Sequence, residues 1–565
     1  MSGTGHASAR TVALSAALAL AALAAPDAFA RAKADRIPPS SRLVLDNGFE
    51  AILIPNRAVP LVTSVVVVRA GLERETPQTN GISHMLEHLL FNGTARRTQE
   101  QIAAEQARYG IINNAHTGTT HTDFFVMASR EEFHRALDLQ ADMLFNSTIP
   151  DAILEKERGI VLNEIARDRA AHHTAVAELF AEVLYHPGPL AMPALGTPES
   201  IEAMPRAAIV GYYTRWYVPN NMTAILMGDF DPEEMAPLVR HAFGGAAPGP
   251  LVAAPANPID PTALGRTHDR RVEAGGRTLR LGAPAPGIGE AAFGTAWLLA
   301  GLLDHQLAPA ANRRLPADAG GAILSAGVSL ETHGAAAAFV VEAELDASLD
   351  WNQAASAVRS EIAARLGQAD WKTDELDRVR IAEKASMLRL WEKPHYFGLD
   401  RAPLIAAGGW EYTRDFLRHL DWVEPSDLKD LARPLSAESS WATFRVGPDA
   451  PALQGADARP PAPAAEAQPS RPTRESRALV DAWKPARPAG DSTPPALARR
   501  TGATPDRINV LRVLPNGLTL SLDVSDESRV FAASVLALNR AAAEPAGRTG
   551  IADMLHRLAG EATRS

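Results

Sequence analysis

The string His84–His88 (HMLEH) constrains this chain more than any other feature, because it lies within a predicted helix. At about 3.6 residues per turn, positions four apart share one helix face, so both imidazoles can reach a single ion. Glu87 borders that face, where it can hold a water molecule without binding the ion. The order is the reverse of HExxH and places the same three groups on one side of a helix.

A metal site in this chain must be built from histidines and carboxylates. There is no cysteine, which excludes thiolate ligands, disulfides and a cysteine nucleophile. A zinc site in a hydrolase usually has three protein ligands and one open position. Glu164, in a helix predicted over 150–170, is the best third ligand, and Glu157 lies two turns earlier on nearly the same face. That carboxylate could orient a ligand, although a solvated polar helix would show the same pattern.

Strand and helix patterns are interleaved through the first half of the chain. Asn47-Gly48 predicts a hairpin turn, and the valine-rich run 63–68 predicts a buried strand. Helices are predicted over 81–91, 98–109 and 130–146, with a further strand or hairpin over 114–128. Strands joined by hairpins and mixed with helices indicate an α+β layer architecture.

The first 30 residues are predicted to be a signal peptide. Arg10 precedes the uncharged run 11–25, and Ala28-Phe29-Ala30 fits a small-x-small cleavage site. The run is too short for a membrane helix, which needs about 20 residues. We therefore expect an exported protein without a membrane span, in the periplasm or secreted. Lys and Arg number 56 against 66 Asp and Glu, which gives no electrostatic reason to expect nucleic acid as a partner.

Residues 447–505 contain 12 of the 42 prolines and are predicted to be a linker. Beyond it, the sequence repeats itself at one ungapped offset, because Asn516-Gly517 aligns with Asn47-Gly48 and Gly550 with Gly81. The repeat carries no second HxxEH motif, since the aligned positions hold Asp553, His556 and Arg557. It stops at Ser565, and we expect this chain to be a fragment of a longer protein.

Together these segments resemble the pitrilysin/insulysin family of zinc metallopeptidases, the inverzincins with an HxxEH motif, which include processing peptidases. GISHMLEHLLFNGT is similar to the family's first metal helix, ERGIVLNEIARD to its second, and NNAHTGTTHTDFF to its edge strand. HPGPLAMPALGTPESI and YYTRWYVPNNMTAILMGDFD resemble the end of its first domain. The similarity is strong over about residues 40–230 and weak over the second unit.

The resemblance implies repeated domains, each a mainly antiparallel sheet flanked by helices, with the two halves of the protein arranged as a clamshell. The expected parts are a signal peptide (1–30), a catalytic zinc-binding domain (36–235), an inactive homologous domain (260–446), the linker (447–505) and the truncated start of a third, degenerate domain (506–565).

The resemblance also implies roles for single residues. One Zn²⁺ per chain would be bound by His84, His88 and Glu164, and Glu87 would be the general base that activates the zinc-bound water. Glu157 would be a supporting carboxylate. Asn114 and Ala115 would lie on an edge strand that pairs with the backbone of a peptide substrate.

The intact motif favours an exported zinc endopeptidase that cuts unfolded peptides or small proteins. The alternative is a non-catalytic scaffold or partner subunit of a larger assembly. The family's second half contributes groups that would lie beyond Ser565, so a missing C-terminal half or partner subunit leaves turnover by this chain alone open. His116 and His121 are predicted to be strand histidines without a ligand role, and His172-His173 a solvated helix face.

Overall fold

The computed structural model describes residues 40–451 apart from 254, 274, 312–321, 369–370 and 392, together with 495, 497, 508–513 and 519–524. These residues belong to two compact units, 1–504 and 505–565. In the second unit, β12 (Ile508–Val513) and β13 (Thr519–Val524) form an antiparallel hairpin. The predicted signal peptide, nearly all of the predicted linker and most of the third repeat lie outside the described residues and stay predictions.

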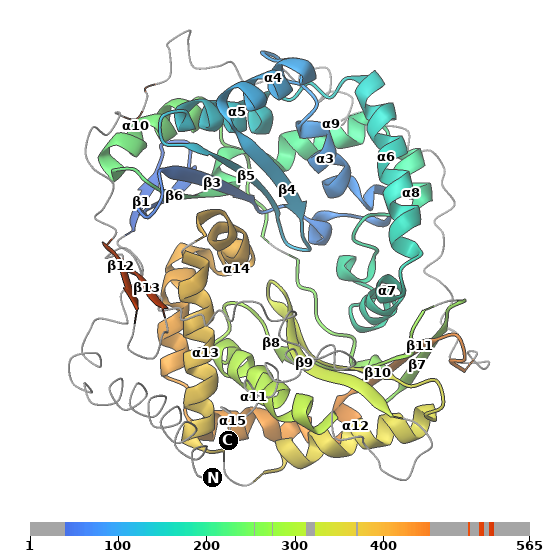
Figure 1. Cartoon of the computed structure of the whole chain (residues 1–565). Coiled ribbons are helices and arrows are strands. Elements are labelled where there is room, and N and C mark those ends of the chain that lie inside the picture. The colour runs from blue at the N-terminus through green and yellow to red at the C-terminus, as the bar shows by residue number, and fades with distance from the viewer. Residues whose placement is uncertain are drawn as a thin grey trace, which may run out of the picture. The chain divides into compact units, whose positions relative to one another are not determined.

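The first unit contains two sheets, each at the centre of one lobe (Figure 1). In the first lobe, all neighbouring strands run antiparallel except β2 and β6, which are parallel. In spatial order the strands are β1 (Ser41–Val44), β2 (Glu50–Pro55), β6 (Met222–Gly228), β3 (Leu61–Val68), β5 (Thr122–Ser129) and β4 (Ile112–Thr117). The central strand β3 is rich in valine and buried at seven of its eight positions, as suits a strand covered on both faces.

The helices of the first lobe bring residues 82–90 and 151–169 together, close to the edge strand β4. Helix α3 packs against both α6 and β4, while α5 lies against β5 and α10 against β2. The helices are α3 (Ile82–Leu90), α4 (Gln99–Tyr109), α5 (Phe133–Asn146), α6 (Asp151–Arg169), α7 (His172–Leu184), α8 (Pro198–Ala203), α9 (Arg206–Trp216) and α10 (Pro232–Phe243). The chain's two most informative motifs, on α3 and α6, therefore become neighbours.

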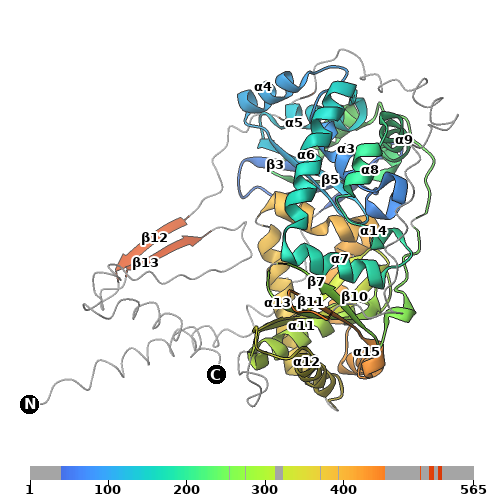
Figure 2. The same cartoon turned by 90° about the vertical axis from the view of Figure 1, so that its right-hand side faces the viewer.

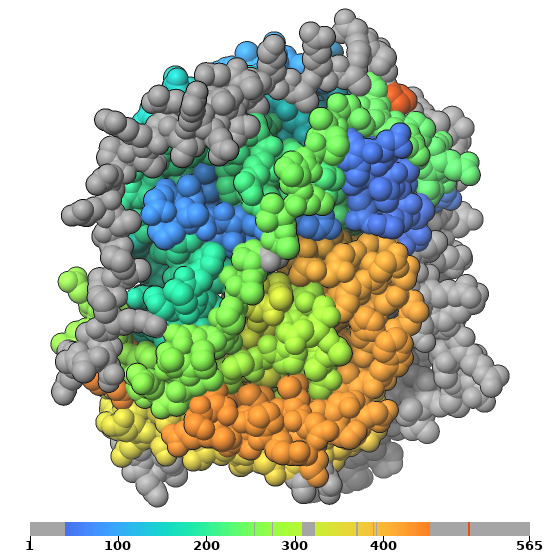
Figure 3. All heavy atoms as spheres, turned by 180° about the vertical axis from the view of Figure 1, so that it is seen from behind, coloured from blue at the N-terminus to red at the C-terminus, as the bar shows by residue number. Residues whose placement is uncertain are grey.

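The second lobe repeats the strand order of the first. Its sheet runs β7 (Thr267–Arg271), β11 (Ala442–Gly447), β8 (Thr278–Pro286), β10 (Ala336–Leu345) and β9 (Ile323–His333), and β7 and β11 form the parallel pair. This order matches β2, β6, β3, β5 and β4 of the first sheet. Its helices are α11 (Phe293–Ala311), α12 (Trp351–Leu366), α13 (Thr373–Trp391), α14 (Pro394–Asp421) and α15 (Pro425–Leu435). Seen from behind, the green connector after α10 crosses from the first lobe to the second (Figure 3).

Helix α14 joins the two lobes. Its helical geometry breaks at Gly409, where φ is 74°. Before that break, Phe397 and Ile405 share a buried cluster with Val65 and Phe125 of the first sheet. Figures 1 and 2 both place α14 between the first sheet and the helices of the second lobe. The second lobe thus covers the face of the first sheet that α3 does not.

The α+β fold class predicted from the sequence is confirmed, as are the hairpin at Asn47-Gly48 and the buried strand ending at Val68. The prediction of a solvated face holds for His173, which is exposed, and is wrong for His172. Because α7 packs against β8 and β11, Nε2 of His172 lies 2.9 Å from Oγ1 of Thr278. Within the described ranges, no helix combines the length and apolarity that a membrane crossing needs.

Gly398 is the point of closest approach between α14 and β3. A Cβ atom there would lie 2.4 Å from Cγ2 of Val65. We expect Gly398→Ala to lower the free energy of unfolding by about 1–3 kcal/mol, because overpacking outweighs the gain in helix propensity of about 1 kcal/mol. Gly211→Ala in α9 is the matched control, since no atom lies within 4 Å of its added Cβ. Urea unfolding gives the free energy of unfolding of both variants. Equal values for Gly398→Ala and Gly211→Ala would contradict the close approach.

His333, at the end of β9, links the lobes through Thr119 in the turn between β4 and β5. Its Nδ1 lies 3.0 Å from Oγ1 of Thr119, and its ring packs edge-on against Tyr185. Burial, and then the nearby Arg280, lowers the pKa of His333 from 6.5 to about 4. Between pH 4 and pH 6.5, His333 is therefore protonated in the unfolded chain and neutral in the folded chain.

The free energy of unfolding should therefore fall as the pH drops from about 6.5 to about 4, with His333 contributing at most about 3 kcal/mol. His333→Gln removes this contribution, so the difference in urea midpoint between wild type and variant should change across that range. A difference that stays constant from pH 7 to pH 4.5 would show that His333 is not held neutral.

Candidate metal centre

A buried carboxylate fixes the first residue of α3. Glu75, which is 4% exposed, accepts hydrogen bonds from the backbone N–H of Gly81 (2.7 Å) and Ser83 (3.0 Å) and from the side-chain amide of Asn80 (3.1 Å). Backbone N–H groups at a helix start have no partner inside the helix, and a negative charge there also favours the helix dipole. Gly81 has φ of 88°, and a Cβ there would lie 2.7 Å from the carbonyl oxygen of Leu195.

His84 and His88 share one face of α3. Their ring centroids are 4.8 Å apart and the rings are nearly perpendicular, at 82°. On the helix's other side, Met85, Leu86 and Leu89 are buried in the core of the first lobe. Because this packing fixes the rotation of α3 about its axis, both imidazoles are directed toward α6.

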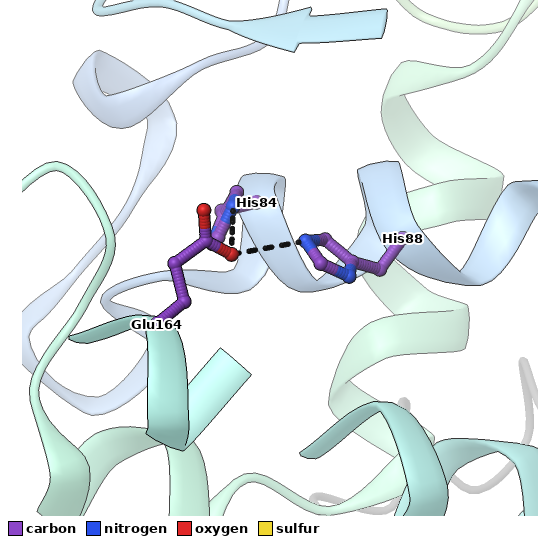
Figure 4. Close-up of side chains that lie close together, drawn as sticks. All are labelled: His84, His88 and Glu164. Atoms are coloured by element: carbon purple, nitrogen blue, oxygen red, sulfur yellow. Dashed lines mark ion pairs between the residues drawn. The ribbon is translucent and has the colours of Figure 1, made fainter. Parts of the chain in front are cut away.

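Glu164 reaches from α6 toward both histidines (Figure 4). Its Oε2 lies 3.7 Å from Nε2 of His84 and 3.5 Å from Nε2 of His88. In the part of the chain that the structure describes, these three residues are the single group whose potential ligand atoms come this close, all within 4.8 Å of one another. Two atoms each about 2.0–2.1 Å from a tetrahedral zinc ion lie roughly 3.4 Å apart. The donor set and its spacing therefore fit zinc.

Glu157 orients one of the two histidines. It is 5% exposed, and its Oε2 lies 3.2 Å from Nδ1 of His88. By accepting a hydrogen bond from Nδ1–H of His88, this carboxylate leaves the lone pair of Nε2 available to a metal ion between His88 and Glu164. Nδ1 of His84 is buried and has no hydrogen-bond partner among the described residues. Burial, and then His88, lowers the pKa of His84 to about 4, so this imidazole is neutral at pH 7 and can bind a metal without losing a proton.

The carboxylate of Glu87 lies beside the edge strand and outside the group of three ligands. Its Oε2 accepts a hydrogen bond of 2.5 Å from Oγ1 of Thr117 on β4. Burial raises the pKa of Glu87, against the opposing effects of this hydrogen bond and of His88 and His116. A carboxyl group with a raised pKa, held at one oxygen, is suited to accepting a proton near neutral pH.

The two predicted substrate-binding residues differ in what they offer. Both lie on β4, at the edge of the sheet. The N–H of Gly118 donates to the carbonyl of His121 (2.8 Å), so these two residues form a hydrogen-bonded pair. Hydrogen-bonded pairs alternate along antiparallel strands, so His116 and Asn114 also exchange backbone hydrogen bonds with β5. Ala115 falls between those pairs, and its N–H and C=O point to the open edge. Asn114 bonds β5 through its backbone and presents only its exposed side chain.

Sequence reasoning did not identify Glu75 or Thr117. Glu75 stands six residues before the glycine at the start of α3, too far for a capping pattern to reveal it. Thr117 could have been found, because it lies two residues after Ala115 and so shares its side of the strand. His116 lies on β4 and is exposed, as predicted for a strand histidine. His121 is buried in the turn just before β5, so its predicted place on a strand is wrong. Tyr212, Tyr213 and Trp216 are buried.

Comparisons with known proteins agree with this arrangement. Residues 51–198 match the family described as Insulinase (Peptidase family M16), and residues 203–383 match the Peptidase M16 inactive domain. The chain is 33% identical over 215 residues to an uncharacterized zinc protease of Mycobacterium leprae, covering 38% of this chain and 48% of that protein. It is 31% identical over 176 residues to the beta subunit of the mitochondrial-processing peptidase of Neurospora crassa, covering 31% and 37%.

The fold is similar to that of a protease from Helicobacter pylori, with a TM-score of 0.64, 18% identity and coverage of 73% of this chain and 100% of that one. The chain spans about half the length, 46–51%, of the first curated relatives that it matches. The two matched segments together cover more than half of the chain and contain every residue of the candidate metal centre. The chain therefore belongs to the M16 (insulinase) peptidase family.

Proposed function

We propose that this chain carries the zinc centre of an endopeptidase that hydrolyses peptide bonds in unfolded peptides or small proteins. The observation that carries the proposal is the approach of Glu164 Oε2 to Nε2 of both His84 and His88, at 3.7 and 3.5 Å. Glu87 stands beside this group without belonging to it. Similarity to proteins named zinc proteases supports the same reading, and we assign one zinc ion per chain.

A zinc ion at this position would polarise a peptide carbonyl and lower the pKa of water toward about 7. Glu87 supplies the proton transfer. Thr117 holds its Oε2, which leaves Oε1 to take a proton from the attacking water and return it to the departing amine. Glu157 keeps the imidazole of His88 in the tautomer that binds through Nε2.

Peptide binding is assigned to the open edge of β4. The N–H and C=O of Ala115 point away from β5, so an extended peptide can add to the sheet as a further strand. Main-chain pairing needs the substrate segment to be unfolded and selects little by sequence. The side chain of Asn114 is exposed at the same edge and is assigned to substrate contact.

A non-catalytic role as scaffold or partner subunit is the second candidate. It is favoured by the match of residues 203–383 to an inactive M16 domain. The N. crassa relative is a subunit, and the chain covers 37% of it. We propose that a second half or a partner subunit completes the enzyme. Export to the periplasm or outside the cell is proposed from residues 1–30 alone.

Glu87→Gln should slow peptide cleavage strongly while leaving zinc bound. Loss of the proton acceptor is expected to reduce kcat by about 10²–10⁴-fold, because Gln cannot take the proton. Cleavage of a quenched fluorescent peptide and zinc content by elemental analysis measure the two properties. Glu155→Gln, on the exposed side of α6, is the matched control and should change neither.

Three outcomes would each overturn a different part of the proposal. Full activity in Glu87→Gln would remove Glu87 from the reaction. A wild-type chain that binds stoichiometric zinc yet cuts no peptide would favour the second candidate, or a requirement for the other half. A wild-type chain that binds no zinc would overturn the metal centre itself.

Glu157→Gln should weaken zinc binding without removing a ligand. The amide accepts a weaker hydrogen bond from Nδ1 of His88, and loss of such a supporting carboxylate typically costs about 10–100-fold in metal affinity. Competition with a chelating dye gives the zinc dissociation constant, again beside Glu155→Gln. An unchanged constant would mean that Glu157 does not orient His88.

A further inference from the structure

The two faces of β4 meet different parts of the molecule. Ala115 belongs to the core that contains Met85 and Leu86 of α3. Phe125, opposite Asn114 on β5, belongs instead to the cluster that contains Phe397 of α14. Because side chains alternate along a strand, Asn114 and His116 lie on the α14 face, away from the metal ligands.

His116 begins a line of rings that crosses from the first lobe to the second. Its ring stacks on Phe125 at 6.5 Å and 13°. Phe125 lies 6.1 Å from His395, whose ring is 4.1 Å from that of Tyr396. Nζ of Lys393 lies 5.6 Å from the centre of the Tyr396 ring. The start of α14 therefore lies beside β5, the neighbour of the edge strand β4.

Most of these groups are accessible and can donate hydrogen bonds. The side chain of His116 is 52% exposed, Tyr396 is 50% exposed, and Lys393 is exposed. Nδ1 of His116 is bound to Oδ1 of Asp123 at 3.1 Å, which leaves Nε2 as the outward group. This hydrogen bond raises the pKa of His116. We call His116, Lys393, His395 and Tyr396 the donor surface.

Three carboxylates lie near the donor surface, and each already has a partner. Glu87, whose charge also acts on His116, accepts the hydrogen bond from Thr117. Asp123 is 4% exposed, and its second oxygen lies 3.7 Å from Nε2 of His121. Asp400, one turn after Tyr396 on α14, forms an ion pair with Arg401. The ammonium of Lys393 is therefore not matched by an exposed, unpaired carboxylate among these neighbours.

Strand geometry specifies which part of a bound peptide meets the donor surface. A peptide residue paired with Ala115 directs its side chain to the α3 face, as Ala115 does. Its neighbour opposite His116 directs its side chain to the α14 face, with the two Cβ atoms about 4.5–5.5 Å apart. That substrate side chain therefore lies beside His116, on the face along which the line of rings continues to Tyr396 and Lys393.

We propose that the donor surface selects peptides with an acidic side chain at the position paired with His116. The inference rests on the proposed peptide binding along β4 and adds a preference to it. When His116 is protonated, its Nδ1–H stays bonded to Asp123 and its Nε2–H can bond the peptide, where a carboxylate is a stronger acceptor than a neutral amide. The ammonium of Lys393 and the hydroxyl of Tyr396 add a positive charge and a further donor along the same face. The pairing is exposed, so the preference should be modest and should shrink as salt increases.

Peptide binding to the zinc-loaded Glu87→Gln chain tests this inference without requiring turnover. Fluorescence anisotropy is measured with labelled peptides that differ only by Gln or Glu at successive positions. We expect one position at which Glu binds about three- to tenfold more tightly than Gln. His116→Gln and Lys393→Met should each reduce this ratio, and the double variant should bring it to about one. Lys429→Met and His241→Gln, far along the sequence from these residues, are the matched controls and should keep it.

Equal affinity for Glu and Gln at every position would overturn the inference, as would a ratio that survives in the double variant or the absence of any peptide binding. Cleavage of the all-Gln peptide by the wild-type chain tests the enzyme separately. Cleavage without a preference for Glu would remove only the donor surface. A preference for Glu in binding, with no cleavage by the wild type, would remove only the catalytic proposal.

Discussion

The hydrogen bonds between Glu75 and the N-terminus of α3 determine the rest of the site. They fix the residue at which the helix begins, and together with the buried Met85, Leu86 and Leu89 they set which side chains face α6. One residue of slippage would turn the helix by about 100° and move His84 and His88 away from Glu164. The same shift would separate Glu87 from Thr117. A buried carboxylate outside the HxxEH string thus controls the geometry of the string.

The second lobe contributes to this site without holding a ligand of it. Helix α14 lies against the sheet face opposite α3, and the close approach at Gly398 leaves no room for a side chain between them. The far face of β4 and β5 is therefore bounded by residues of the second lobe, including His395. If peptides bind along β4 as proposed, residues of the second lobe can affect them through β5, where His395 meets Phe125.

The candidate residues on each of the two helices could be predicted from the sequence because helix periodicity is local. Two histidines four apart must share a face, and Glu157 and Glu164 seven apart nearly do. Contacts between distant segments could not be predicted this way. Thr117 approaches Glu87 only after β4 packs on α3, and His172 meets Thr278 only after α7 packs on the second sheet. The roles of Asn114 and Ala115 were distinguishable only once the hydrogen-bonding register of β4 and β5 was known.

The two sheets share one strand order, yet their edge strands differ. β9 occupies in the second sheet the place that β4 occupies in the first. On β9, the N–H of Val328 donates to Oδ1 of Asp304 from α11, at 2.9 Å, so a side chain already occupies part of that edge. On β4, the main-chain groups of Ala115 remain directed outward, beside the carboxylate of Glu87. The same topology can therefore support peptide binding in one lobe and restrict it in the other, through a single side chain from a covering helix.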